Sequence, residues 1–409
     1  MSKAPVAPLE KMFRPIAACL VLVAAFLPAP ARAQDADTPP PGTLVFGPLH
    51  VTPSVRLTDL GVDNNVFNEP VDPKSDFTFT VTPQVDLAMR IRRLRLSYSS
   101  VADYVYYQKY ESERGTNASG TARAEYDLGI FRPYVSAQGI STRKRLNPEV
   151  DTRARHHDTI YGAGLAVSVA SRTRVFVNLT RATTSFDDGE SFRGEDLQQA
   201  FDGRRRTVDG GVSIDLTPVT RFTLTLSREE QRFVFSPDRD ADSWRIAPGF
   251  GFSTDGPLRG AASFGFRHFA PLSPDLPGYD GLVSAVAVGA TLYGRHDLQA
   301  VVNRDVQYSY DEATDYFVGT TTGLTWTTLV GGPFDVRGTA SRTLMDYRGI
   351  VDAGSDVVKA FGVGVGYRFT ERLRAGLNVE WSRRDSDRSV DRQYRNHRVF
   401  AGLTWGTTL

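Results

Sequence analysis

The stretch "FTFTVTPQVDLAMRI", from Phe77 to Ile91, decides the fold class. Its odd-numbered positions are apolar, whereas its even-numbered positions carry Thr, Gln, Asp, Ala and Arg. This alternation has a period of two, so it predicts a β-strand with one oily face and one polar face. Strands in soluble sheets have about five or six residues, whereas a tilted strand needs about nine to eleven to cross a bilayer. The length of the stretch therefore favours a membrane-spanning strand.

The same pattern recurs down the chain. A tight turn at Arg92-Arg93 joins the first stretch to the Tyr-rich segment 94–110, and a longer polar loop follows. Further hairpins of this kind include 156–169 with 173–186, and 357–369 with 373–384. With a first strand near 49–57 and a last strand at 394–406, we expect about 18 strands, within a range of roughly 16 to 18.

The connections alternate between short and long. Tight turns such as "YGR" (293–295) and "TER" (370–372) alternate with polar loops such as "KRLNPEVDTRARHH" (144–157). Transmembrane barrels have this asymmetry, with short periplasmic turns and long extracellular loops. Only a closed barrel satisfies every backbone group of a sheet in lipid. We therefore predict an all-β fold, a single transmembrane antiparallel β-barrel.

In such a barrel the oily faces meet lipid and the polar faces line the interior. Pro83 lies in the middle of a strand that cannot be an edge, so it predicts a local bulge. Aromatic residues near strand ends are typical of the girdles at the two membrane interfaces. They are Tyr98, Tyr293, Trp326, Tyr367, Phe369, Trp381 and Trp405.

The N-terminus predicts export. Basic residues precede the short apolar run Ile16 to Leu27, and Ala31-Arg32-Ala33 resembles a cleavage site, so residues 1–33 are expected to be a removed signal peptide. Residues 34–47 are Pro-rich and predict an unstructured periplasmic lead-in, with the barrel over 48–409. Removal of the signal peptide takes away the single cysteine, Cys19. The expected location is the outer membrane of a Gram-negative cell.

Segment 51–110 also carries a distinctive series of residues. It contains Asp63-Asn64-Asn65-Val66-Phe67, then Ser75-Asp76, then a V-x-P element that ends at Pro83, and then the Tyr-rich strand. This series resembles the opening of the putative β-barrel porin 2 family. The resemblance implies an outer-membrane barrel, and a role near capsule or exopolysaccharide export, with which members are often associated. It implies no catalytic residues.

Charged residues on the expected inward faces are the candidate functional residues. They would set the field inside a channel and select solutes by charge, or they would form ion pairs that stiffen the wall. The sequence leaves both interpretations open. The candidates are Arg90, Arg95, Asp103, Arg221, Glu229, Arg245, Asp335, Arg337, Arg374 and Glu380.

Two other segments have alternative interpretations. The glycines of "GVGVGYRF" (362–369) do not precede a helix, so they predict wall curvature or the close approach of an inward-folded loop instead of a nucleotide site. The basic run Arg204 to Arg206 predicts either contact with lipopolysaccharide phosphates or a solvated loop end. No motif indicates a metal, a cofactor or catalysis, and the balanced charge argues against nucleic-acid binding.

The first functional interpretation is a channel that forms or supports a polysaccharide export system. A general diffusion porin for small hydrophilic solutes and a plugged barrel that acts as a scaffold are the alternatives. The expected partners are outer-membrane lipid and lipopolysaccharide, the barrel assembly machinery and, in the first case, polysaccharide export components. The assembly machinery usually reads a terminal aromatic residue, whereas the last aromatic residue here is Trp405.

Overall fold

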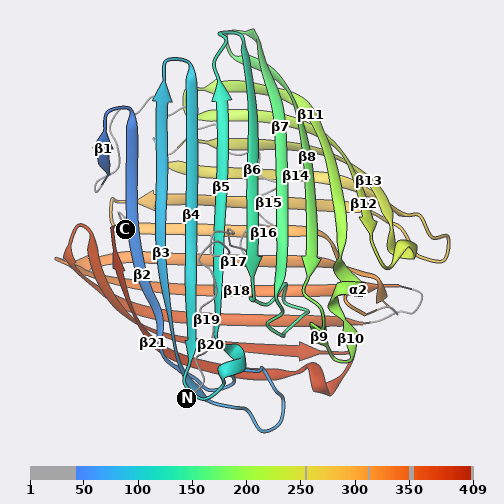
Figure 1. The fold of residues 1–409 in the computed structure, drawn as a ribbon. Helices are drawn as coiled ribbons and strands as arrows, with labels where there is room; N and C mark the ends of the chain where they lie inside the picture. Colours follow the sequence, from blue (N-terminus) through green and yellow to red (C-terminus); the bar gives the residue numbers. More distant parts are fainter. Residues whose placement is uncertain (1–42, 254–255, 312–313, 350–353, 407–409) are drawn as a thin grey trace, which may run out of the picture.

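The computed structural model describes residues 43–253, 256–311, 314–349 and 354–406. Within them, eighteen long antiparallel strands form a closed barrel (Figure 1). The signal peptide, Cys19 and the lead-in up to residue 42 lie outside the described residues. The barrel strands are β2 (Leu49–Asp63), β3 (Asp76–Ile91), β4 (Leu94–Tyr107), β5 (Gly115–Tyr126), β6 (Phe131–Thr142), β7 (His156–Ala170), β8 (Thr173–Phe186), β11 (Gly203–Thr217), β12 (Thr220–Phe233), β13 (Ala241–Phe252), β14 (Leu258–Pro271), β15 (Tyr279–Leu292), β16 (His296–Tyr308), β17 (Tyr316–Gly331), β18 (Phe334–Arg348), β19 (Ser355–Thr370), β20 (Leu373–Ser386) and β21 (Tyr394–Trp405).

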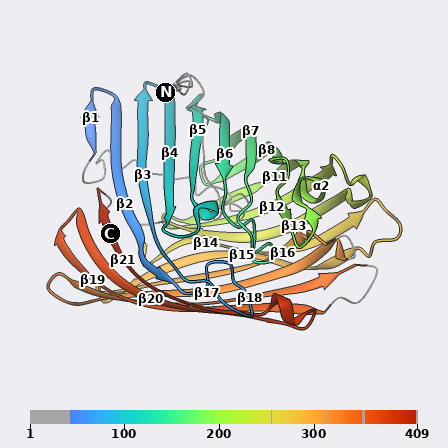
Figure 2. The same ribbon diagram turned by 60° about the horizontal axis from the view of Figure 1, so that its bottom comes forward.

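The barrel closes where its first and last long strands meet. β2 pairs with β3 on one side and with β21 on the other, so no long strand is left with a free edge. Figure 2 shows β21 beside β2 at this seam. A short additional strand, β1 (Leu44–Phe46), pairs with the start of β2. The expectation of an unstructured lead-in is therefore wrong for residues 44–46.

Two features of the first hairpin differ from the sequence predictions. β2 does not end at Leu57 but continues to Asp63, through a register shift between Thr58 and Gly61 against β3. The predicted bulge at Pro83 is wrong, because β3 keeps one register against β4 from Val81↔Tyr104 to Gln84↔Val101. The missing proline donor interrupts the ladder locally without inserting a residue. The irregularity lies instead in β2, where Asp59 has a φ of 56°.

The two faces of the wall differ as expected. Large apolar side chains are exposed on the outer face, and they include Leu226, Phe264, Val363 and Trp381. All seven predicted girdle aromatics are likewise exposed. On the inner face of β3, Thr78 and Thr82 are buried, and the Thr82 hydroxyl donates a hydrogen bond of 2.8 Å to Asp103. A wall that is oily outside and polar inside is a transmembrane barrel wall.

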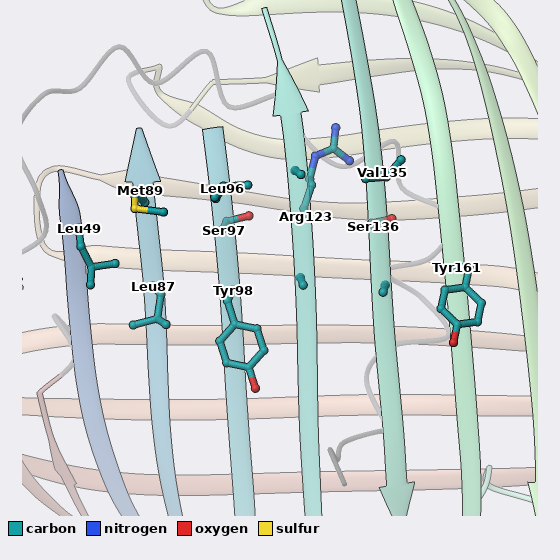
Figure 3. Close-up of a pocket in the computed structure, with 13 residues that line it drawn as sticks. Leu49, Leu87, Met89, Leu96, Ser97, Tyr98, Arg123, Val135, Ser136 and Tyr161 are labelled. Carbon is teal, nitrogen blue, oxygen red and sulfur yellow. The ribbon is translucent and has the colours of Figure 1, made fainter. Parts of the chain in front are cut away.

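One part of the oily surface is hollowed. Alanines 122, 124 and 137 on β5 and β6 leave a depression of about 580 Å³ between larger neighbours. Figure 3 shows Tyr98, Tyr161, Leu87 and Val135 around it. The depression lies on the lipid-facing side, because Tyr98 pairs with Ala122 and Ala137 pairs with Tyr161 on the outward face.

The long loops contain the remaining secondary structure. The connection from β8 to β11 holds the hairpin β9 (Ser191–Phe192) and β10 (Glu195–Asp196), followed by helix α2 (Leu197–Phe201). Single turns η2 (Glu111–Glu113), η3 (Pro237–Arg239) and η5 (Val390–Arg392) lie in other long loops. Over the described residues, none of the helices has the length and apolar character to cross a membrane.

The glycines of β19 make room for side chains from the neighbouring strands. A Cβ at Gly366 would collide with the Arg374 guanidinium, and one at Gly364 would collide with the Asn378 amide. Arg374 of β20 thereby reaches across β19 to Asp335 of β18 (Nη2–Oδ1 2.5 Å). The glycines do face inward, but this ion pair explains them better than an inward-folded loop does.

Candidate channel constriction

The loop between β6 and β7, residues 143–155, crosses the interior at the long-loop end of the barrel. Its Glu149 is fully buried, accepts a hydrogen bond from the Ser309 hydroxyl (2.7 Å), and lies 3.4 Å from the Arg392 guanidinium. Arg384 of β20 donates to the carbonyl oxygens of Pro148 and Glu149 at 3.1 and 3.3 Å. These partners belong to distant parts of the wall, so the loop bridges the lumen. We call residues 143–155 the inward loop.

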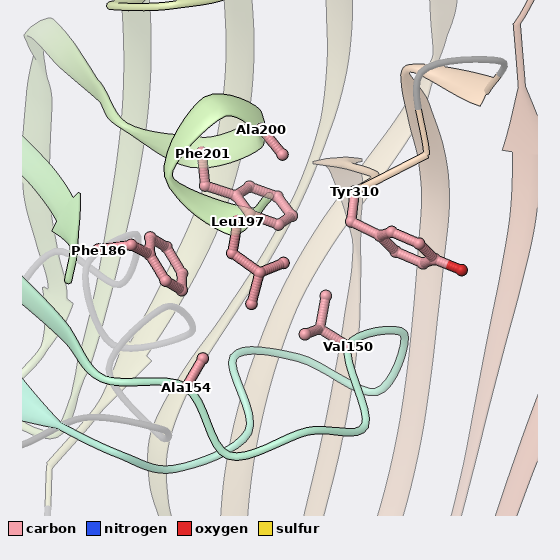
Figure 4. Packing of buried hydrophobic residues seen from close by; sticks show 7 residues of the cluster. All are labelled: Val150, Ala154, Phe186, Leu197, Ala200, Phe201 and Tyr310. Atoms are coloured by element: carbon pink, nitrogen blue, oxygen red, sulfur yellow. The ribbon is translucent and has the colours of Figure 1, made fainter. Parts of the chain in front are cut away.

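An apolar cluster holds the other side of the inward loop. Val150 and Ala154 pack with Phe186 at the end of β8 and with Leu197 of α2. Figure 4 shows these side chains facing one another, together with Ala200, Phe201 and Tyr310. Val150 and Leu197 are both 0% exposed. The inward loop is therefore packed as tightly as a protein core, and its position is fixed by both apolar and polar contacts.

Buried charges surround Glu149. Asp356 at the start of β19 forms ion pairs with Arg384 and with Arg392 (3.2 Å to the latter), and the Tyr347 hydroxyl donates to the same carboxylate at 3.1 Å. Arg392 also contacts the Tyr310 hydroxyl at 3.0 Å. Glu149, Asp356, Arg384 and Arg392 are nearly or fully inaccessible to solvent. Each is paired, as buried charges must be.

A buried arginine ties further loops to this region. Arg239 of η3 donates to the carbonyl oxygens of Ala200 (2.7 Å), Asp315 (3.0 Å) and Ser309. The end of β16 separates from β15, because their pairing stops at Ser284↔Arg304, four residues before Tyr308, whereas β16 stays paired with β17 as far as Tyr308↔Tyr316. Tyr308 instead packs on Phe233 and Phe269, which face the interior. Residues 143–155, residues 187–202, and residues 309–311 with 314–315 of the connection between β16 and β17 thus meet inside the long-loop end.

The protonation of Glu149 is expected to couple to the position of the inward loop. Burial raises the pKa of Glu149, against the hydrogen bond from Ser309, the positive charges of Arg392 and Arg384 and the Tyr310 amide. A released loop would have the ordinary carboxyl pKa of about 4.3. We call the loop seated when Glu149 occupies its buried site and released when it does not. At pH values between the ordinary pKa and the raised pKa, Glu149 is more often protonated in the seated loop than in the released loop. The seated state therefore becomes more favourable as the pH falls through this range, and its stability does not change further outside the range.

We therefore expect the conductance of the protein to decrease when the pH is lowered from neutral towards about 4.3. The measurement is macroscopic conductance in planar bilayers at a series of pH values. Glu149→Gln, which keeps the acceptor for Ser309 but does not ionise, should lose most of this dependence. A conductance that rises on acidification, or the same profile in both proteins, would contradict the assignment.

The structure places all ten predicted lumen residues on the inward face. Seven of them have ion-pair partners: Asp103 with Lys144, Arg221 with Asp215, Glu229 with Arg267, Arg245 with Asp305, Asp335 with Arg374 and Arg368, and Glu380 with Arg398. Arg267 is the centre of the largest group, because it contacts Glu229 at 2.7 Å and Asp305 at 2.8 Å. The effect of the ten predicted lumen residues on the selection of solutes stays a prediction.

Arg90, Arg95 and Arg337 differ from the other seven. No carboxylate among the described residues forms an ion pair with them, and the same holds for inward-facing Arg56. Arg90 lies directly opposite Arg95 beside the tight turn that joins β3 to β4. Arg337 is exposed on the inward face of β18. The half of the lumen near the short turns therefore has an excess of unpaired positive charge.

The residues of the family-like motif stabilise the barrel seam. Asp63 accepts hydrogen bonds of 3.0 Å from the Asn65 amide nitrogen and from the Asn396 side chain of β21. The Asn65 side chain donates to Arg395 O of β21 at 3.0 Å, and Asn64 exchanges main-chain and side-chain bonds with His397. Val66 is buried, and its carbonyl oxygen accepts a bond of 2.9 Å from Arg145 of the inward loop.

The second half of the motif ties adjacent loops together. Phe67 stacks edge-on against Tyr110 at 5.0 Å, and Asp76 accepts hydrogen bonds from the backbone of Phe77, Lys109 and Tyr110. Ser75 contributes only its carbonyl oxygen, which accepts from Lys109. The motif thus has a structural role that sequence reasoning did not assign.

The most important residues of the constriction were missed. Glu149, Asp356, Arg384, Arg392 and Arg239 are charged residues in or beside long polar loops, where charge usually indicates solvent. One available signal was the presence of apolar Leu146, Val150 and Ala154 inside the otherwise polar inward loop. Leu146 does pack against the buried cluster.

A closed barrel of eighteen strands, with a polar interior bridged by an inward loop, defines a β-barrel of the porin type in the outer membrane. The model of the family described as Putative beta-barrel porin 2 matches residues 43–406, and the chain belongs to this family. Porins are channels, and the family gives no indication of an enzyme. A search of curated proteins finds no match.

Several solved structures have a similar shape at low sequence identity. OccK2 (OpdF) of Pseudomonas aeruginosa has a TM-score of 0.49 and 12% identity, over 88% of this chain and 98% of that chain. A BenF-like porin from Pseudomonas fluorescens Pf-5 has a TM-score of 0.48 and 12% identity, over 87% and 98%. OccAB3 of Acinetobacter baumannii has a TM-score of 0.47 and 9% identity, over 87% and 99%.

Proposed function

We propose that this protein is a diffusion channel for small hydrophilic solutes, in which the inward loop limits the passage. The observation that carries the proposal is the seating of Glu149 and Val150 across a lumen whose wall is polar and charged. Barrels of 16 to 18 strands are wide enough to leave an aqueous channel. A bridging loop reduces such a channel to the size of small solutes.

Polysaccharide export receives no support from the family match or from the contacts of the motif. The motif residues bind the seam and the neighbouring loops, and they do not form a surface for a polymer. The diffusion channel therefore fits better than the first interpretation of the sequence. A plugged scaffold differs from it in one measurable way, because it would not conduct ions.

We further propose that the channel prefers anions. Near the short turns, Asp335 forms an ion pair with Arg374 and Asp215 with Arg221, whereas Asp86 accepts hydrogen bonds from Ser99 and Gln84. Arg90, Arg95 and Arg337 remain without such a partner and contribute a net positive field. Charged rings of one sign at a narrow part of a pore select for the opposite sign.

Arg337→Ala should reduce the preference for anions. A unit charge about 8 Å from a passing ion contributes about 0.5 kcal/mol in water, which corresponds to roughly a twofold change in permeability. The measurement is the reversal potential in a KCl gradient across a planar bilayer. Arg337→Lys is the matched control, since it retains the charge and should retain the selectivity.

Arg221→Ala should act mainly on stability, because Arg221 lies against the wall with its Nε 2.6 Å from Asp215. An unchanged reversal potential in Arg337→Ala would contradict the selectivity role and favour a structural role for the inward charges.

A further inference from the structure

The outer surface carries a row of four cations at the long-loop end of the wall. Arg342 of β18 lies directly opposite Lys359 of β19, Lys359 opposite Arg383 of β20, and Arg383 opposite Arg395 of β21. All four side chains are exposed. They share the outward face with Phe361 and Trp381 of the same strands, so they face away from the lumen. We call them the outer cation row.

The row is poorly compensated within the protein. Like charges that lie directly opposite on neighbouring strands destabilise a sheet. Asp385 is the carboxylate that contacts the row, at 2.6 Å from Arg383 and 3.5 Å from Lys359. Among the described residues, no carboxylate forms an ion pair with Arg342 or Arg395. Four cations and one anion leave an excess of positive charge that an external anion would stabilise.

The height of the row on the wall is that of lipid head groups. The next outward row towards the middle of the membrane consists of Ala340, Phe361, Trp381 and His397. Phe361 and Trp381 are 56% and 41% exposed. Exposed aromatic side chains at this position form the interfacial girdle. The cations lie two residues, about 6.6 Å, further along each strand, which places them beside the phosphate groups of the leaflet.

We propose that the outer cation row binds the phosphate groups of lipopolysaccharide in the outer leaflet. Three strand intervals of about 4.8 Å give the row a length of about 14 Å, so it can contact more than one phosphate of the same glycolipid. A lipid with several phosphates satisfies such a row better than a phospholipid with one. This inference depends on the long loops facing outwards and not on the proposed channel function.

The test uses a triple variant, Arg342→Gln, Lys359→Gln and Arg395→Gln, which leaves the Arg383–Asp385 pair in place. Folded protein in detergent is titrated with lipopolysaccharide, and folding is checked by heat-modifiable migration on a gel. We expect the affinity of the triple variant to be at least tenfold weaker than that of the wild type. The matched control is Arg228→Gln, an exposed outward cation on β12 with ion-pair partners Glu230 and Asp242, which should bind nearly as well as the wild type.

Competing ligands identify the group that is bound. Dephosphorylated lipopolysaccharide and phosphatidylglycerol should both bind the wild type much more weakly than intact lipopolysaccharide. Equal affinities of the wild type and the folded triple variant would overturn the proposal. Equal binding of the dephosphorylated form would assign the affinity to acyl chains, and full competition by inorganic phosphate would assign it to a free-anion site, so either result would also overturn it.

Discussion

Release of the inward loop should produce the largest change in permeability. In the double variant Glu149→Ala, Val150→Ser, the loop loses the bonds from Ser309 and Tyr310 and an apolar anchor that is 0% exposed. Burial of a valine contributes about 1.5–3 kcal/mol, and hydrogen bonds to a charged group about 1.5–3 kcal/mol. A combined loss of about 3–6 kcal/mol shifts the equilibrium between the seated and the released loop by more than about 100-fold.

We expect this variant to admit larger solutes in liposome-swelling measurements with a graded series of sugars. The matched control is Glu111→Ala, Val234→Ser, which makes the same chemical changes in two exposed loop positions. The control should keep the size limit of the wild type. If the two double variants have the same size limit, the inward loop does not set the passage.

Removal of Asp356 should cause the largest loss of stability. Its carboxylate is 0% exposed and is paired with both Arg384 and Arg392. Asp356→Ala therefore leaves two buried guanidinium groups with weaker compensation, from Glu149 at 3.4 Å, Asp151 at 3.9 Å, the Tyr310 hydroxyl and neighbouring carbonyl groups. Breaking a buried ion pair from one side costs about 3–5 kcal/mol, and we expect a loss of this size in urea unfolding of the folded barrel in detergent.

The control for this experiment is Asp387→Ala. Asp387 is exposed and contacts the Ser355 hydroxyl, so its removal should change the free energy of unfolding by less than about 0.5 kcal/mol. A loss in Asp356→Ala of similar size to that of the control would mean that the buried charges do not stabilise the closed end of the lumen.

The strands could be predicted from the sequence because their faces meet two different solvents. The lipid outside and the polar lumen inside impose a period of two on every strand. This period can be recognised in the local sequence of each strand, without knowledge of the neighbouring strands. The hairpin predicted at 156–169 and 173–186 appears as β7 and β8. β2 was predicted too short, because the register shift at Thr58–Gly61 interrupts its alternation.

The interior of the long-loop end could not be predicted in the same way. Glu149 and Ser309 are 160 positions apart, and Glu149 and Arg392 are 243 apart. No local period relates these residues, since the fold of the loops alone brings them together. Charge in a long polar loop also has the same appearance in sequence whether it faces solvent or a buried partner. The short apolar series in the inward loop was the one visible indication of burial.

Single-channel recording of the wild type beside the Glu149→Ala, Val150→Ser variant tests directly whether this barrel is a channel narrowed by its inward loop. We expect a small, steady conductance with anion preference in the wild type and a clearly larger conductance in the variant. Bilayers that stay silent with both folded proteins, or equal conductances in the two, would contradict it.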